Sequence, residues 1–255
     1  MIPKRIFYVW GYGEPKNQIT NICLENWRTM LPNYEIIEIN EKTPQWFDFE
    51  QEYKNNLWFK TVYDLKMWAY VADYMRIAVL LNHGGIYFDT DVTVYKDLET
   101  LLKDKMFIGN VRNNHPELAI IGAEKGHPYL KDLFEFYKEE IWKSPLYIIV
   151  QVFMKILEKY QVQYTTKEIC GNELIKIYPP EYISPYHYGE EFTHDLITPN
   201  TYTVHWENGS WIRKKILFFL VNKHRIPLKT LLKQIDFIEK SDKTANDKTK
   251  SKIKE

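Results

Sequence analysis

The sequence predicts an α/β fold with a Rossmann-like, mostly parallel central sheet flanked by helices. Three observations lead to this class. A strand, a helix and a second strand follow one another within residues 6–40, an almost wholly apolar helix covers residues 67–81, and β-like and helical segments keep alternating up to residue 206. The length of 255 residues suffices for one domain with a sizeable core.

The first unit begins with residues 6–10, which are rich in β-formers and are stopped by the turn sequence Gly11-Tyr12-Gly13. A helix is expected over residues 17–30. Pro32-Asn33 then breaks the chain before a strand at residues 34–40. This order predicts a parallel βαβ unit with a right-handed crossover.

The helix predicted over residues 67–81 has two charged residues, Asp73 and Arg76, among apolar and aromatic ones. A helix of this composition is buried on nearly all sides. Glycines at 84 and 85 can end it, and residues 86–88 then form a central strand.

Later segments continue the alternation. We expect strands at 106–109, 118–122 and 201–206, and helices at 128–141 and 145–160.

Composition excludes several classes of function. The chain has 34 basic and 34 acidic residues, so no overall charge favours nucleic acid. Cys23 and Cys170 lack the spacing of a zinc site or disulfide framework. The N-terminus shows no signal peptide, and the apolar run 216–221 is too short to cross a bilayer. We therefore expect a cytoplasmic location.

The C-terminal region is basic. Residues 211–240 hold eight lysines and arginines against two acids, a net charge of +6. Apolar residues at 216–220 lie among these lysines, so residues 212–240 are expected to form basic amphipathic helices. Two interpretations stay open: a solvated face, or peripheral contact with the inner face of the cytoplasmic membrane or with the acceptor. Residues 241–255 form a Lys-rich tail that we expect to be flexible.

The acidic triplet Asp89-Thr90-Asp91 follows the predicted strand 86–88. Side chains two residues apart can converge on one ion where a strand gives way to a loop. Hard divalent cations take oxygen ligands, and a nucleotide diphosphate supplies two more. Ligands of α/β sheets bind at the carboxyl ends of the strands, where this triplet lies. The triplet therefore predicts a metal and diphosphate site.

Asp73 and Arg76 are three residues apart on the apolar helix and share one face. They could form an intrahelical ion pair without further function. Alternatively, burial of Arg76 points to a phosphate or a second acid as its partner. His205, at the end of a late strand, could complete a mixed nitrogen and oxygen site that suits Mn²⁺ better than Mg²⁺.

Several blocks together resemble glycosyltransferase family 32, whose members include bacterial capsular and lipooligosaccharide transferases and the yeast initiating mannosyltransferase. The glucosyltransferase domain of the large clostridial toxins is similar more distantly. The likeness covers residues 2–211 and rests on Ile2-Pro3-Lys4-Arg5-Ile6, Trp10-Gly11, residues 69–76, Gly84-Gly85-Ile86-Tyr87-Phe88-Asp89-Thr90-Asp91, His205-Trp206 and Ser210-Trp211.

The resemblance implies a GT-A catalytic domain over residues 1–211 and a retaining transfer from a nucleotide sugar. UDP-Gal, UDP-GalNAc or UDP-Glc would be the donor, with Mn²⁺ or Mg²⁺ as the cation. Its implied metal ligands are Asp89, Asp91, His205 and Ser210. Its implied catalytic residues are Asp73, Arg76 and Asp89, and its implied donor contacts are Val9, Trp10, Asp73, Arg76, Asp89, Asn208, Ser210 and Trp211.

The predicted activity is hexosyl transfer to a glycan acceptor, lipid-linked, in bacterial surface polysaccharide synthesis. One alternative is a toxin-like effector that glycosylates a host protein. A second alternative is a non-catalytic carbohydrate-binding domain.

Overall fold

The computed structural model describes residues 1–11, 13, 15–111, 115–162, 164–187, 189–207, 214–238 and 240. Its centre is a seven-stranded sheet in the order β2-β1-β3-β6-β5-β8-β7. The strands are β1 (Arg5–Val9), β2 (Glu35–Ile39), β3 (Gly85–Phe88), β5 (Met106–Val111), β6 (His115–Ala123), β7 (Cys170–Gly171) and β8 (Lys176–Tyr178). A second, two-stranded sheet pairs β4 (Val92–Val94) with β9 (Thr203–His205).

The sheet is mostly parallel, as the sequence predicts. Strand β1 runs parallel to both β2 and β3, and β5 runs parallel to β8. Strands β6 and β7 are antiparallel to their neighbours, so five of the seven strands point the same way. The reversal of β6 has a simple cause, because β5 ends at Val111 and β6 begins at His115. That connection is too short for a parallel crossover.

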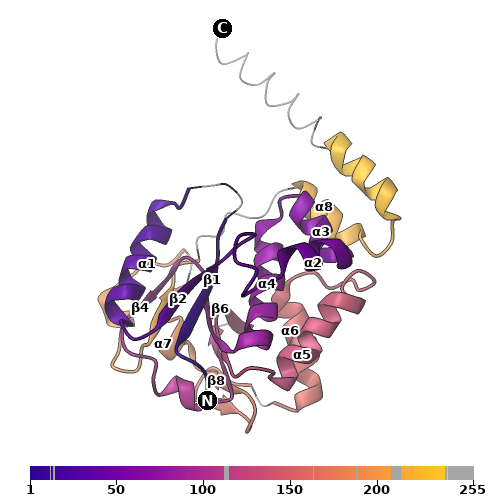
Figure 1. Cartoon of the computed structure of the whole chain (residues 1–255). Coiled ribbons are helices and arrows are strands. Elements are labelled where there is room, and N and C mark those ends of the chain that lie inside the picture. Colours follow the sequence, from indigo (N-terminus) through magenta and orange to yellow (C-terminus); the bar gives the residue numbers. More distant parts are fainter. Residues whose placement is uncertain are drawn as a thin grey trace.

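Helices cover both faces of the sheet (Figure 1). Alternate residues of β1 divide the core, since Ile6 and Tyr8 pack with α1 (Gln18–Met30), whereas Phe7 and Val9 pack with α4 (Trp68–His83). The remaining helical elements are α2 (Phe49–Asn55), α3 (Leu57–Asp64), η1 (Leu101–Lys103), α5 (Pro128–Glu135), η2 (Phe136–Glu140), α6 (Ile149–Leu157), η3 (Glu158–Tyr160), α7 (Pro180–Ile183), η4 (His194–Leu196) and α8 (Lys214–Asn222).

Helix α4 confirms the prediction of a helix buried on nearly all sides: every residue from Asp73 to Leu80 is buried. It ends at Gly84, whose φ of +66° favours glycine. A Cβ at this position would lie 2.6 Å from the backbone nitrogen of Lys125. The close approach of these two segments therefore requires glycine.

Some expected elements differ in extent. The helix expected over 128–141 ends as an α-helix at Glu135 and continues as the π-helical turn η2. The helix expected over 145–160 begins only at Ile149. The late strand is limited to β9, which leaves the central sheet and pairs with β4. Strands β7 and β8 were not predicted, because segments of two or three residues carry no periodic signal.

Helix α8 and a further helix over residues 228–238 lie at one end of the molecule, beside α3 (Figure 1). Some of the apolar residues of these two helices are buried in the core, and others are exposed to solvent. Phe219 stacks on Trp58 with ring centroids 6.1 Å apart, and Leu220 and Leu231 are also buried in the core. Leu217 and Phe237 are exposed. Within the described residues, no helix has the length and hydropathy needed to span a bilayer.

Lys223, the residue directly after α8, anchors the end of this helix to the segment after η2. Its side chain is 1% exposed, and its ammonium group donates to the carbonyl oxygens of Ile141 and Ser144 just after η2. Burial lowers the pKa of Lys223 to about 8.

This lowered pKa predicts a specific pH dependence of stability. Between pH 8 and pH 10.5 the unfolded chain keeps a proton on Lys223 that the folded chain releases, so stability rises with pH there. The rise should be on the order of 1 to 3 kcal/mol. Urea unfolding at pH 7.5 and pH 9.5 should show the rise in the wild type and its absence in Lys223→Met. An equal pH dependence in both proteins would contradict the assignment.

Candidate functional site

A cavity of about 790 Å³ opens at the carboxyl ends of β1 and β3. These neighbouring strands run parallel, so the loops that follow them leave the same edge of the sheet. Helix α4 forms one wall and the start of α6 another. Residues that line the cavity include Val9, Trp10, Trp68, Tyr70, Asp73, Arg76, Tyr87, Asp89, Thr90, Asp91, Glu117, Leu118, Ile148, Val150, His205 and Glu207.

The acidic triplet forms the turn between β3 and β4. The Asp89 backbone nitrogen donates to the carbonyl oxygen of Ala119 at 2.8 Å, which ties the turn to β6. The Trp206 nitrogen donates to the Asp91 carbonyl oxygen at 3.0 Å, which ties it to the segment after β9. Backbone contacts from two distant segments thus hold both aspartates in place.

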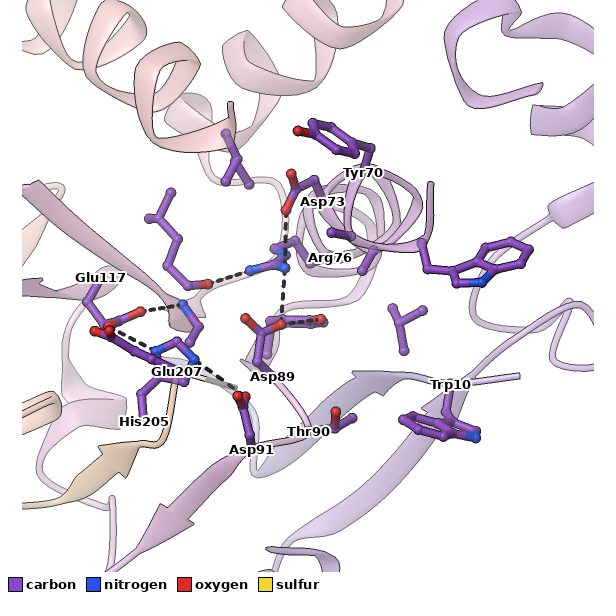
Figure 2. Close-up of a pocket in the computed structure, with 18 of the residues that line it drawn as sticks. Trp10, Tyr70, Asp73, Arg76, Asp89, Thr90, Asp91, Glu117, His205 and Glu207 are labelled. Atoms are coloured by element: carbon purple, nitrogen blue, oxygen red, sulfur yellow. Dashed lines mark hydrogen bonds and ion pairs between the residues drawn. The ribbon is translucent and has the colours of Figure 1, made fainter. Parts of the chain in front are cut away.

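Arg76 connects three elements inside the cavity (Figure 2). Its Nη2 lies 3.1 Å from Oδ1 of Asp73 and 3.0 Å from Oδ1 of Asp89. Its Nη1 donates to the carbonyl oxygen of Leu118 at 2.7 Å. The intrahelical pair expected from the spacing therefore forms, and Arg76 also has the second acidic partner considered above.

Burial sets the ionisation of these acids. It raises the pKa of Asp73 to about 7, although the neighbouring Arg76 opposes the rise. Burial likewise raises the pKa of Asp89, with Arg76 opposing and Asp91 adding to the rise. The hydroxyl of Tyr87 donates to Oδ1 of Asp89 at 2.9 Å. Burial therefore disfavours the ionised forms of Asp73 and Asp89, and a nearby cation would stabilise those forms.

His205 lies between two carboxylates (Figure 2). Its Nδ1 is 3.2 Å from Oε2 of Glu117, and its Nε2 is 3.4 Å from Oδ1 of Asp91. Burial alone would lower the pKa of His205, but Glu117 and Asp91 outweigh it and raise the pKa well above the usual value. The imidazolium thus supplies positive charge where the carboxylates converge.

The donor set fits a divalent cation. Carboxylate oxygens of Asp89 and Asp91 and the Nε2 of His205 offer the mixed oxygen and nitrogen ligands typical of Mn²⁺. Single ligand atoms of Glu117, His205 and Glu207 also lie within 4.8 Å of one another. A cation bound at Nε2 would displace its proton and replace the positive charge of the ring.

Trp10 lies across the cavity from this cluster (Figure 2). It is the first residue after β1, and its backbone nitrogen donates to the Ile39 carbonyl oxygen at 3.2 Å. Val9, the last residue of β1, is buried and also lines the cavity. Because Trp10 and Asp91 line opposite sides of the cavity, an elongated ligand could extend from one to the other.

The structure gathers the described residues of the predicted site into this one cavity. They come from β1, α4, the turn after β3, and β9: Val9, Trp10, Asp73, Arg76, Asp89, Asp91 and His205. The other predicted residues, Asn208, Ser210 and Trp211, lie outside the described residues.

Among the polar residues of the cavity that the sequence analysis did not predict are Tyr87, Glu117 and Glu207. Glu117 gave a weak indication of a functional role, because it is an acid directly before the apolar residues of β6. Tyr87 and Glu207 gave none, since a tyrosine in a strand and a glutamate after a strand are common.

Comparison with known proteins agrees with this site. Residues 18–108, which include the triplet, match the family model described as "Glycosyltransferase sugar-binding region containing DXD motif". Inositol phosphoceramide mannosyltransferase 3 of Schizosaccharomyces pombe is 29% identical over 133 residues, 51% of this chain and 35% of that protein. An uncharacterised glycosyltransferase of Acanthamoeba polyphaga mimivirus is 34% identical over 94 residues, 34% of this chain and 35% of that protein.

The matched region spans about a third of the length of each of these curated relatives. Among solved structures, the PaToxG glycosyltransferase aligns with a TM-score of 0.46 at 16% identity, over 62% of this chain and 68% of that chain.

The bridging role of Arg76 leads to a prediction about stability. Arg76→Met should lower the free energy of unfolding by about 3 to 5 kcal/mol, because it leaves the buried Asp73 and the half-buried Asp89 without their charged partner. Urea denaturation measures this change. Lys60→Met is the matched control, since it breaks the solvent-exposed Lys60–Asp64 pair and should change little. Equal effects of the two substitutions would show that Arg76 is not a structural bridge.

Proposed function

We propose that this chain, which belongs with the DXD-motif glycosyltransferases, transfers a hexose from a nucleotide diphosphate sugar to a glycan acceptor with the help of a divalent cation. The observation that carries the proposal is the cavity in which Asp89, Asp91 and His205 converge opposite Trp10. An acidic cluster and a distant aromatic side chain are what a diphosphate and a base require at their two ends.

Asp89, Asp91 and His205 would hold the cation, Mn²⁺ or Mg²⁺, with Ser210 as a further ligand. A bound cation neutralises the charge that develops on the departing diphosphate. The contacts already described keep the acids oriented, since Arg76 and Tyr87 both bind Oδ1 of Asp89. Such fixed groups avoid reorganisation during the reaction.

The base and the sugar of the donor would bind at different ends of the cavity. Trp10 would stack on the base beside Val9, and Asp73 and Arg76 would contact the transferring sugar near Asp89. The burial of Arg76 supports this role, because a guanidinium held by two carboxylates keeps one geometry. Asn208, Ser210 and Trp211 would complete the donor site. We favour a UDP-hexose, UDP-Gal, UDP-GalNAc or UDP-Glc, and a transfer that retains anomeric configuration.

The acceptor we propose is a lipid-linked glycan of a bacterial surface polysaccharide, capsule or lipooligosaccharide. The name of the Schizosaccharomyces pombe relative describes mannose transfer to inositol phosphoceramide, itself a lipid. This relative supports a membrane-anchored acceptor and adds GDP-mannose to the donors to be tested.

A membrane contact through residues 212–240 would bring the enzyme to such an acceptor. Among the described residues of this segment, four large apolar side chains are exposed: Leu217, Val221, Leu232 and Phe237, the last of them 72% exposed. The exposed cations Lys229 and Lys233 lie on the second helix of this segment, and the exposed Arg225 lies in the loop before it. This pairing of apolar and basic groups suits an anionic lipid surface.

Removing one acid should abolish the activity without unfolding the chain. Asp91→Asn should lower metal-dependent hydrolysis and transfer by at least about 100-fold, because an amide is a poor ligand for a hard cation. The assay measures product release from a panel of UDP-hexoses and GDP-mannose, with Mn²⁺, with Mg²⁺ and with chelator. Asp195→Asn, an exposed position in η4, is the matched control and should keep wild-type activity.

Two outcomes would contradict this proposal. Turnover that is unaffected by the chelator would exclude metal dependence. Lack of hydrolysis and of binding across the whole panel would favour a carbohydrate-binding domain.

The membrane contact has its own test. Lys229→Glu combined with Lys233→Glu should reduce cosedimentation with vesicles of phosphatidylglycerol and phosphatidylcholine at least about tenfold, since each lysine near an anionic surface contributes about 1 kcal/mol. Lys103→Glu combined with Lys131→Glu changes the net charge equally at exposed positions on η1 and α5. Equal loss in both double variants would rule out a specific basic face.

A further inference from the structure

We infer that Glu117 is a positioning residue for His205: it holds the imidazole through Nδ1 so that Nε2 faces Asp91 and the cation. This inference rests on the proposed metal-dependent transfer and extends it to a residue outside the predicted ligand set. It distinguishes Glu117 from a metal ligand, the other role that its location allows.

The carboxylate of Glu117 is held at both oxygens. Its Oε1 accepts the backbone N–H of Ala119 at 2.9 Å, and its Oε2 lies 3.2 Å from Nδ1 of His205. The residue is 6% exposed. Glu117 is therefore a buried carboxylate that its two contacts hold in one orientation.

Both partners of Glu117 donate a proton. A backbone N–H can only donate, and Nδ1 must carry the proton if Nε2 is to bind a cation. The glutamate carboxylate supplies two acceptor oxygens and satisfies both partners. A glutamine supplies one acceptor, so it would leave the Ala119 N–H unpaired or turn its amide NH₂ toward Nδ1.

The orientation of the His205 ring depends on Glu117 because the two residues lie on different sheets. His205 belongs to β9, which pairs with β4 and lies outside the central sheet, whereas Glu117 lies on β6 inside it. Without Glu117, rotation of the ring could exchange its two nitrogens. The bond from Nδ1 thus sets the side of His205 on which a ligand can bind.

The same contact argues against Glu117 as a ligand. Although Glu117, His205 and Glu207 have ligand atoms within 4.8 Å, the His205 nitrogen that faces Glu117 is the one its carboxylate already engages. The other nitrogen faces Asp91 at 3.4 Å. A cation bound at Nε2 therefore lies on the Asp91 side.

Mn²⁺ binding in a double-mutant cycle tests the inference. Electron paramagnetic resonance measures the affinity of the full chain for Mn²⁺, alone and with UDP, in the wild type, Glu117→Gln, His205→Gln and the double variant. We expect Glu117→Gln to weaken Mn²⁺ binding about 10- to 100-fold, as loss of a carboxylate that orients a ligating histidine does. In the His205→Gln background the same substitution should change the affinity less than about twofold.

A spectroscopic measurement separates this role from a purely structural one. With Mg²⁺ and UDP bound, the Nδ1 proton of His205 should give a low-field proton resonance, assigned by its loss in His205→Gln. Glu117→Gln should shift or abolish that resonance while thermal unfolding stays cooperative. An unchanged resonance would overturn the positioning role.

The remaining outcomes separate this inference from the proposed function. Additive losses in the cycle would make Glu117 an independent ligand, and wild-type affinity in Glu117→Gln would remove it from the site. Either result, with Asp91→Asn still unable to bind Mn²⁺, overturns the inference alone. A wild-type chain that binds no Mn²⁺ with or without UDP would overturn the proposed function itself.

Discussion

The guanidinium of Arg76 joins the helix, the turn and the strand from which the cavity is built. It bonds to Asp73 one helical turn away, to Asp89 after β3 and to the carbonyl oxygen of Leu118 on β6. A buried charge is costly, so each of these partners is needed to offset its desolvation. Because one planar group satisfies all three, α4 can pack with its charged residues inward. The cavity floor is thereby fixed relative to the sheet.

Around this centre, the site is assembled from segments far apart in the chain. The Asp89–Asp91 turn is anchored to Ala119 on β6 and to Trp206 after β9. The pairing of β4 with β9 places His205 beside Val92, next to the turn. The small two-stranded sheet therefore joins the late part of the chain to the acidic turn.

Charge balance unites these contacts. Glu117 and Asp91 flank one imidazolium, and Asp73 and Asp89 share one guanidinium. Each cationic side chain thus lies between two acids in a poorly solvated space, where attraction is stronger than in water. A divalent cation beside Asp91 would take over the role of the imidazolium proton and leave the guanidinium pair intact.

The sequence by itself determined the α/β class, the buried helix α4 and the acidic turn after β3, because periodicity, glycine stops and charge within apolar runs are local signals. It also identified Arg76 and His205 as unusual. Only the tertiary structure decided that β6 runs antiparallel, that α8 buries part of its apolar face, and that Glu117 meets His205. These features depend on contacts between distant residues, such as Glu117 and His205, which are 88 positions apart in the chain. Local pattern carries no record of such partners, whereas packing and the pairing of buried charges select them.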